Sequence, residues 1–410
     1  MWLSIPTTQV FFILEYWRRI KIIRVTMREI AKELVTFLQD YSWIYNFSNI
    51  RILLDKDDHP FIHHFSQEAL IKFHEKRNKL LHLIKTKVIH SYDFSDNTPS
   101  TEKDLFKGMS PKKIHECVRF ADILSKLKCG KSILDIGSGL GYVDHILETV
   151  YGYKTLGIEK SRFGKSPTNR SVVAIDLKDN EEGFLNKLID DRLDGSACMI
   201  GLHACGDLTP TMLKAFVYGD RFTSLAVVSC CYHKMSMPFT PMSKFFREEI
   251  DFSSIFTPYG LRLASQEVAS DDKSQLLDER HRFFTYRSVL EVLSGEMSIN
   301  KSKRKAVRKN GIKTFEDYIQ NVFDRFDFDP KFEQGYISNR LREIFKEHEP
   351  NFSLLKYVII LQDYVQKLIE YSVLLDRVIY LQENDYDKVI VYEIFNEKIS
   401  PRNKLIFCPA

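Results

Sequence analysis

Three glycines at alternating positions follow a short apolar segment, and this spacing lets the backbone approach a ligand. The segment covers residues 133–136, and the glycines are Gly137, Gly139 and Gly141. Glycine has no Cβ, so the chain can turn tightly there, and the helix that follows offers free N–H groups. The spacing is G-x-G-x-G, whereas a dinucleotide fingerprint reads G-x-G-x-x-G. We therefore expect a cofactor loop but not that of a dehydrogenase. The competing interpretation is a tight turn with no ligand.

Carboxylates stand where a cofactor on this loop would need acceptors. Asp135 near the end of the first apolar segment suits a sulfonium cofactor that carries an amino group. Glu159 ends the second segment about 20 residues after the loop, where a ribose diol is held, and Asp176 ends the third, where adenine is contacted. A solvated charge or a turn residue is the alternative at each position. The full set of candidate cofactor-binding residues is Lys113, Asp135, Gly137, Ser138, Gly139, Gly141, Glu159, Asp176, Leu177 and His203.

Histidines and cysteines follow the fourth and fifth apolar segments. The first group lies in Gly-Leu-His-Ala-Cys-Gly-Asp-Leu at 201–208, and the second in Cys-Cys-Tyr-His at 230–233. Substrates of open α/β sheets lie outside the carboxyl ends of the strands, so we expect catalytic residues here. The alternative is buried thiols and satisfied histidines. We predict no metal, because adjacent cysteines chelate poorly and no C-x-x-C is present. The candidate catalytic residues are His203, Cys205, Asp207, Cys231, Tyr232 and His233.

Apolar segments that alternate with helical ones must position these residues. Strands are expected at 133–136, 155–158, 171–175, 196–200 and 224–229, with helices between them, which predicts a parallel sheet covered on both faces. Residues 9–90 and about 240–385 have mainly helical patterns. The segments 389–392 and 405–407 could form the antiparallel ending of the same sheet. The expected division is 1–104 as an N-terminal helical region, 105–238 with 386–410 as the α/β domain, and 239–385 as a helical insertion.

Composition excludes some classes of protein. The chain has 410 residues, 44% hydrophobic content and a net charge of +4, so neither disorder nor an overall basic surface is indicated. Seven cysteines, an odd number, favour reduced thiols in an intracellular protein, cytoplasmic or nuclear. The apolar run at 10–14 is too short to span a bilayer, and we expect no transmembrane span. The native protein could also begin at Met27, with the preceding residues as an extension of the gene model.

The segment from Lys301 to Lys313 holds seven basic residues and no acidic one. Such a run is typical of a solvated loop, and the alternative is a patch that contacts RNA.

At several of these segments the sequence resembles the methyltransferase-like protein 25 family, also described as containing a ribosomal RNA adenine dimethylase domain. The resemblance spans about 108–410, and its matching pieces include 108–116, 135–141, 201–208, 230–235, 375–377 and 400–403. It implies a class I methyltransferase fold of Rossmann-like type, with S-adenosylmethionine as cofactor and the late strands split off by the helical insertion.

The pair His-x-Cys-Gly and Cys-Cys-x-His also looks like a family of tRNA 2′-O-methyltransferases. Adenine-N6 methyltransferases carry an Asn or Asp, Pro, Pro, aromatic tetrad after the fourth strand, whereas this chain has Leu-His-Ala-Cys at 202–205. We therefore expect a methyltransferase in which His203 or His233 acts as base and Asp207 orients one of them. RNA is one possible acceptor. The alternatives are a protein or small-molecule acceptor, or a non-catalytic interaction module.

Overall fold

A computed structural model describes most of the chain. The described residues are 27–55, 59–92, 103–127, 129–160, 172–174, 183–266, 274–297, 299 and 311–410. They fall into two compact units. The first holds the described residues within Met1–Gln39, Lys76–Glu267 and Leu368–Ala410, and the second holds those within Asp40–Glu75 and Val268–Lys367.

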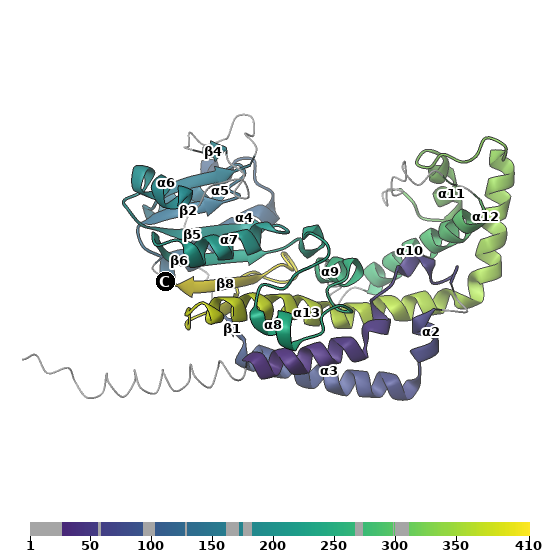
Figure 1. Cartoon of the computed structure of the whole chain (residues 1–410). Coiled ribbons are helices and arrows are strands. Elements are labelled where there is room, and N and C mark those ends of the chain that lie inside the picture. The colour runs from purple at the N-terminus through teal and green to yellow at the C-terminus, as the bar shows by residue number, and fades with distance from the viewer. Residues whose placement is uncertain are drawn as a thin grey trace, which may run out of the picture. The chain divides into compact units, whose positions relative to one another are not determined.

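The first unit contains one eight-stranded sheet with the order β1-β7-β8-β6-β5-β2-β3-β4 (Figure 1). The strands from β4 through β6 are parallel, β8 is antiparallel to both of its neighbours, and β7 is parallel to β1. The bounds are β1 (Ile89–Ser91), β2 (Ser132–Ile136), β3 (Lys154–Glu159), β4 (Val172–Ala174), β5 (Ala197–Ala204), β6 (Phe222–Ser229), β7 (Ile390–Glu393) and β8 (Lys404–Pro409).

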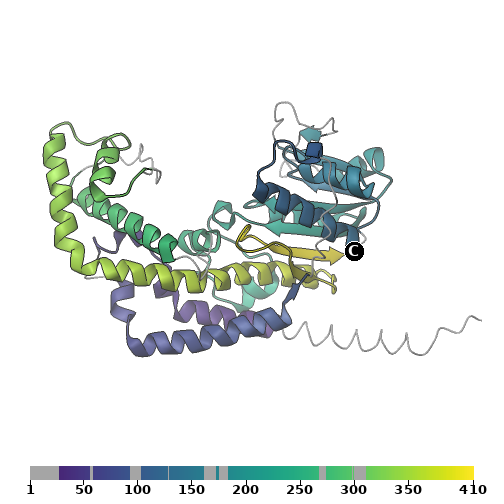
Figure 2. The ribbon, with the colours of Figure 1, turned by 180° about the vertical axis from the view of Figure 1, so that it is seen from behind.

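Helices cover both faces of this sheet, and its central strands are mostly apolar and buried. Every residue of β2 is buried, as parallel strands between two helical layers require. Helix α7 (Leu208–Tyr218) lies in front of the sheet in Figure 1, and α4 (Pro111–Lys126) comes to the front in the reverse view of Figure 2. Apolar residues of α4 and of α5 (Tyr142–Tyr151) form one buried cluster with the central strands. Helix α6 (Phe184–Arg192) precedes β5.

Local sequence signals set several boundaries of these helices. Ser110 Oγ accepts a hydrogen bond from the backbone N–H of Lys113, and Pro111 occupies the first turn of α4, as expected. Gly152 ends α5 in the left-handed conformation, with a φ of 70°.

The second unit is helical. It contains α2 (Pro60–His64), α10 (Ser274–Glu296), α11 (Phe315–Phe323), α12 (Gln334–His348) and the 3-10 helices η1 (Ser42–Ile44), η2 (Asn49–Arg51) and η7 (Glu349–Asn351). Two long helices, α3 (Gln67–Lys87) and α13 (Phe352–Glu383), belong to both units. Within the second unit, Arg280 forms a bidentate ion pair with Asp363 of α13, at 2.7 and 2.9 Å.

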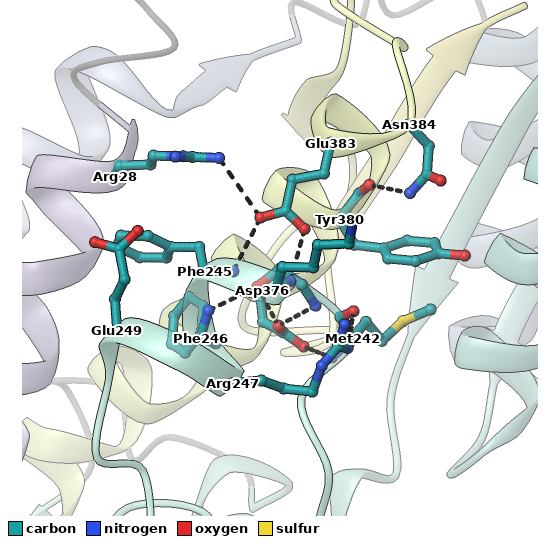
Figure 3. Close-up of polar contacts among 12 residues, drawn as sticks. Arg28, Met242, Phe245, Phe246, Arg247, Glu249, Asp376, Tyr380, Glu383 and Asn384 are labelled. Atoms are coloured by element: carbon teal, nitrogen blue, oxygen red, sulfur yellow. Dashed lines mark hydrogen bonds and ion pairs between the residues drawn. The ribbon is translucent and has the colours of Figure 1, made fainter.

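The later half of α13 is anchored in the first unit by carboxylates (Figure 3). Asp376 accepts hydrogen bonds from the backbone N–H groups of Met242 and Ser243, both at 2.9 Å. Glu383 accepts from the backbone N–H groups of Lys244 and Phe245, at 2.7 and 2.9 Å. Glu383 therefore satisfies the first two free N–H groups of α8 (Lys244–Glu249), and Asp376 holds the two residues before this helix. The segment leading to this helix comes directly after the Cys-Cys-Tyr-His motif, so α13 helps to fix that motif's surroundings.

The α/β fold expected from the sequence is confirmed, and each expected strand has a counterpart in the sheet. The expectation of helix throughout residues 9–90 was wrong at its end, because Ile89–Ser91 forms β1 beside β7; residues 9–26 lie outside the described part. Of the two late strands, β8 is antiparallel, whereas β7 runs in the same direction as β1. Two of the four boundaries between the compact units fall within α3 and α13, and the expected domain division at 104 and 385 stays a prediction. Among the described helices, none is long and apolar enough to cross a membrane.

Candidate functional site

The glycine loop closes over the end of β3. Gly137, Gly139 and Gly141 all have positive φ values, of 75°, 56° and 74°. Residues with a Cβ rarely adopt this conformation, so the turn requires glycine. The backbone N–H of Gly139 donates to Glu159 Oε2 at 3.0 Å, and the other Glu159 oxygen accepts from the backbone N–H of Lys160 at 2.9 Å. The carboxylate therefore lies against the loop, as the sequence predicts.

The loop leaves room on its outer side. A Cβ added at Gly139 would meet no atom within 4 Å, whereas one at Gly137 would contact the Leu208 side chain at 3.3 Å. The tip at Gly139 therefore faces open space beside the Glu159 carboxylate. A backbone cradle with an acceptor at its rim fits the ribose of a nucleoside cofactor.

Two other predicted cofactor residues lie close to this loop. Asp135 is buried in β2, two positions before Gly137. The Cys117 thiol lies within electrostatic reach of both Lys113 and Asp135; burial, followed by the effect of Glu116 and Asp135, raises its pKa to about 12, against the lowering effect of Lys113. Lys113 and Asp135 therefore both lie near the Cys117 thiol. Asp176 and Leu177 lie outside the described residues.

His203 lies in a strained conformation at the end of β5. Its φ is 63°, and the register with β6 shifts between Leu202 and Ala204. A non-glycine residue pays for this conformation, and such strain concentrates at functional sites. The strand thus continues beyond the expected end at residue 200 and bulges at the histidine, which turns this side chain toward α4.

His203 pairs with Glu116 of α4. His203 Nε2 lies 3.0 Å from Glu116 Oε1, and the same oxygen accepts a hydrogen bond from Ser400 Oγ at 2.7 Å. Glu116 is only 3% exposed. Burial raises the pKa of Glu116, but the hydrogen bonds and charges of His203, Ser400 and Lys112 outweigh it, so the pKa is lowered overall. A buried carboxylate thus holds the imidazole ring in place.

An aromatic ring from the segment after β7 lies between two histidines. Phe395 is 6.0 Å from the His115 ring and 6.3 Å from the His203 ring, between centroids. His115 Nε2 accepts a hydrogen bond from the backbone N–H of Asn396 at 3.1 Å. Burial, together with Arg119, lowers the pKa of His115. The segment 395–400 therefore docks on α4 beside the His203–Glu116 pair.

Three thiols converge beside the backbone of His203. Cys205 Sγ is 3.0 Å from Cys230 Sγ, which is 3.5 Å from Cys231 Sγ and also 3.5 Å from the carbonyl oxygen of His203. The hydrogen bond from Cys230 lowers the pKa of Cys205 to about 5, against burial. The sequence prediction that the cysteines after the fourth and fifth strands lie together is consistent with this geometry.

Asp207 serves the turn that carries Cys205. Its carboxylate accepts hydrogen bonds from the backbone N–H and the Oγ of Ser236, at 3.0 and 2.6 Å. Thr209 Oγ1 donates to the carbonyl oxygen of Ala204 at 2.9 Å and lies 3.2 Å from Ser229 Oγ. These contacts join the end of β5 to the end of β6. They give Asp207 a positioning role, and its expected role in orienting a catalytic histidine stays a prediction.

Tyr232 points into the core, which favours a packing role over the expected catalytic one. It is 1% exposed, and its Oη donates to Glu370 Oε1 of α13 at 3.1 Å. The guanidinium of Arg377 lies 5.3 Å from the centre of the Tyr232 ring and donates to Ser229 Oγ. Arg402 pairs with Glu370 at 3.1 Å. His233, in the 3-10 helix η5 (Tyr232–Lys234), has an exposed side chain.

The sequence analysis found candidate residues that line the site, but it missed four residues that support them from behind. These are Glu116, Arg377, Phe395 and Ser400. Three of the four fall within segments that carried the family resemblance, at 108–116, 375–377 and 400–403. Those segments meet around β5 and β6, although about 300 positions separate the first from the last.

Comparisons with known proteins identify a methyltransferase domain in this chain. Residues 112–238 match a family model described as "Methyltransferase domain". The chain is 27% identical over 235 residues to "Probable methyltransferase-like protein 25" of Homo sapiens, which covers 53% of this chain and 37% of that protein. It is 26% identical over 217 residues to the protein of that name in Mus musculus, covering 49% and 35%. The match thus spans little more than a third of these relatives' length. No solved structure matches. The resemblance to the methyltransferase-like protein 25 family is confirmed.

Proposed function

We propose that this methyltransferase domain binds S-adenosylmethionine at the glycine loop and holds a methyl acceptor at the carboxyl ends of β5 and β6. The observation that carries the proposal is the hydrogen bond between the Gly139 N–H and Glu159, at a loop whose three glycines all need positive φ. When bound, the cofactor supplies a methyl group on a sulfonium, which is already an excellent leaving group.

The protein's main contribution is then to hold an acceptor close and aligned in a site with little water. His203 lies at the carboxyl end of β5, and Glu159 lies at the carboxyl end of β3 in the same parallel sheet. The carboxyl ends of parallel strands share one edge, so cofactor and acceptor would meet there.

His203 is the base that the geometry favours. Its Nε2 faces the Glu116 carboxylate, so the ring proton belongs on Nε2 and the lone pair of a neutral ring on Nδ1. Nδ1 could then take a proton from a hydroxyl or protonated amine of the acceptor. Glu116 orients the ring and stabilises the imidazolium that results. His233, which is exposed on η5, is the other histidine that the sequence predicts as a base, and it is compared with His203 below.

Cofactor binding is the first test. S-Adenosylhomocysteine and NAD are titrated separately into the full chain and into Gly139→Arg, with calorimetric detection. We expect binding of the first compound alone, and its loss in the variant, because the added side chain fills the open space at the loop tip. Binding of neither compound would instead indicate a non-catalytic interaction module.

The acceptor is tested with a tritiated methyl donor and extracts as substrate. Incorporation that is lost after ribonuclease treatment and that falls steeply with salt would identify RNA. Incorporation that resists ribonuclease would identify a protein or small molecule. Of the basic segment expected to contact RNA, residues 301–310 lie outside the described part. His203→Ala and His233→Ala are compared in the same assay. If both variants bind cofactor and keep full turnover, neither histidine is the base.

A further inference from the structure

The three thiols of Cys205, Cys230 and Cys231 form a cluster with the size and composition of a metal site. Their sulfurs all lie within 4.8 Å of one another, and among the described residues they are the group of three possible ligands that could share one ion. Two of the separations are 3.0 and 3.5 Å. With a Zn–S bond of about 2.3 Å, a tetrahedral ion needs sulfurs about 3.8 Å apart, so small side-chain rotations suffice.

From the sequence we predict no metal, because Cys230 and Cys231 are adjacent and no C-x-x-C motif is present. The fold changes that argument, because the third thiol comes from a different strand. Cys205 follows β5 and the pair follows β6, and these strands are hydrogen-bonded neighbours. Cys205 supplies a ligand from a second segment, so the adjacent pair does not have to surround the ion alone.

The two segments that carry the thiols are fixed to each other independently of any ion. Gly206, with a φ of 56°, packs so tightly that an added Cβ would lie 2.7 Å from the carbonyl oxygen of Lys234. Asp207 binds Ser236 through two hydrogen bonds, and Ser229 is held by Arg377. The cluster therefore stands on a preorganised frame, which reduces the entropic cost of bringing three ligands together.

Access and charge also suit a cation. Cys205 and Cys231 are partly exposed, whereas Cys230 is buried, so an ion can enter from the side of the two outer thiols. Three thiolates around a divalent ion leave one net negative charge. Lys234 lies near enough to Cys205 to act on it electrostatically and would offset that charge. In contrast, Cys117, Cys129, Cys198 and Cys408 are all buried.

We propose that Cys205, Cys230 and Cys231 bind one zinc ion at the carboxyl ends of β5 and β6. Soft thiolate ligands select zinc over the hard cations magnesium and calcium. Three protein ligands leave the fourth tetrahedral position to water or to a donor atom of another molecule, a pattern typical of reactive rather than purely structural zinc. The proposal does not depend on the proposed methyl transfer, because metal content is measured without any acceptor.

The test measures zinc in the full chain purified under reducing conditions. The protein is stripped with a chelator, reloaded with zinc sulfate, desalted and analysed by elemental mass spectrometry. We expect about one zinc per chain in the wild type and about a tenth of that or less in Cys205→Ala and Cys231→Ala. Cys408→Ala is the matched control, since it removes a buried thiol away from the cluster, and it should keep its zinc.

A second measurement covers the case in which the variants fail to fold. Cobalt chloride added to stripped wild-type protein should give the intense near-ultraviolet charge-transfer band of thiolate ligation, and zinc should abolish it. The proposal is overturned if reduced wild-type protein takes up no zinc, or if Cys205→Ala binds as much as the wild type. A disulfide between Cys205 and Cys230 that forms in air, without zinc uptake by the reduced chain, would likewise overturn it and indicate a redox pair.

Calorimetry with S-adenosylhomocysteine on the same samples separates this proposal from the proposed function. If the wild-type protein binds that compound but takes up no zinc, only the proposed zinc site is rejected. Zinc uptake without such binding would reject the cofactor site alone.

Discussion

Gly157 of β3 lies directly beneath the cofactor loop, and adding one methyl group there should damage the loop without breaking the sheet. An alanine Cβ at this position would lie 2.5 Å from Ser138 Oγ and 2.9 Å from Ser138 Cβ. The backbone of Gly157 has no positive φ, so alanine itself is tolerated by the strand. The conflict is therefore confined to the contact between β3 and the second residue of the loop.

The size of the effect follows from these distances. Ordinary contact begins at 3.4 Å, so Ser138 Cβ must retreat by about 0.5 Å (3.4 minus 2.9), and rotation of the hydroxyl alone cannot relieve this. Overpacking of a tight site costs about 1–3 kcal/mol. If the loop must return to its original position to bind a ligand, affinity falls about five- to 150-fold, since 1.4 kcal/mol is a factor of ten.

Calorimetric titration of S-adenosylhomocysteine into Gly157→Ala measures the loss of affinity, and thermal unfolding of the same variant measures the loss of stability. Ser138→Gly removes the two atoms that conflict, so the double variant Gly157→Ala/Ser138→Gly should recover the affinity of Ser138→Gly alone. This recovery separates steric conflict from a general loss of folding. If Gly157→Ala binds as tightly as the wild type, or if the double variant shows no recovery, the contact between Gly157 and Ser138 does not control the loop.

Two further predictions concern buried charges. The pKa of Glu116 is lower in the fold, so its carboxylate stabilises the protein above the unfolded pKa of about 4.3, and this contribution is lost as the pH falls through the folded pKa. Glu116→Gln should therefore cost about 1–3 kcal/mol near pH 7 and almost nothing in acid, as measured by denaturant unfolding at several pH values; a cost independent of pH would contradict this. Arg377→Met should cost about 1–3 kcal/mol, because it removes the buried guanidinium that donates to Ser229 Oγ and lies near the Tyr232 ring, whereas Arg342→Met, at an exposed pair with Glu316, should cost less than about 1 kcal/mol. Equal midpoints in denaturant unfolding for the two arginine variants would show that the buried cation is not needed.

The sequence predicts the strands and the tight glycine turn well because their signals are local. A glycine at every second position, and an acidic residue at the end of the next strand, follow directly from the turn geometry. Gly139 and Glu159, two residues that the sequence predicts to bind the cofactor, are joined by a hydrogen bond in the structure. The alternation of strands and helices likewise predicts a parallel sheet covered on both faces.

The contacts of the catalytic candidates could not be obtained in this way because they join distant parts of the chain. Glu116 and His203 are 87 positions apart, and Ser400 is 284 positions from Glu116. No local pattern distinguishes Glu116, which holds His203, from the many acidic residues on helix surfaces. Asp207 was the natural expectation because it is close in sequence, yet its carboxylate faces Ser236. Similarly, β1 has only three residues, too few for an alternating pattern to stand out from the preceding helix.

The order of strands in the sheet has a consequence for how the chain folds as it is synthesised. β8 is translated after all the other described strands, yet it lies between β6 and β7. Until residues 404–409 have been made, β7 and its partner β1 have no strand through which to join the rest of the sheet. The hydrogen-bonding edge of β6, next to the cysteines, therefore stays uncovered through the synthesis of the long helical middle. Nascent chains stalled before β8 should expose this edge to chaperones or to pairing with other strands.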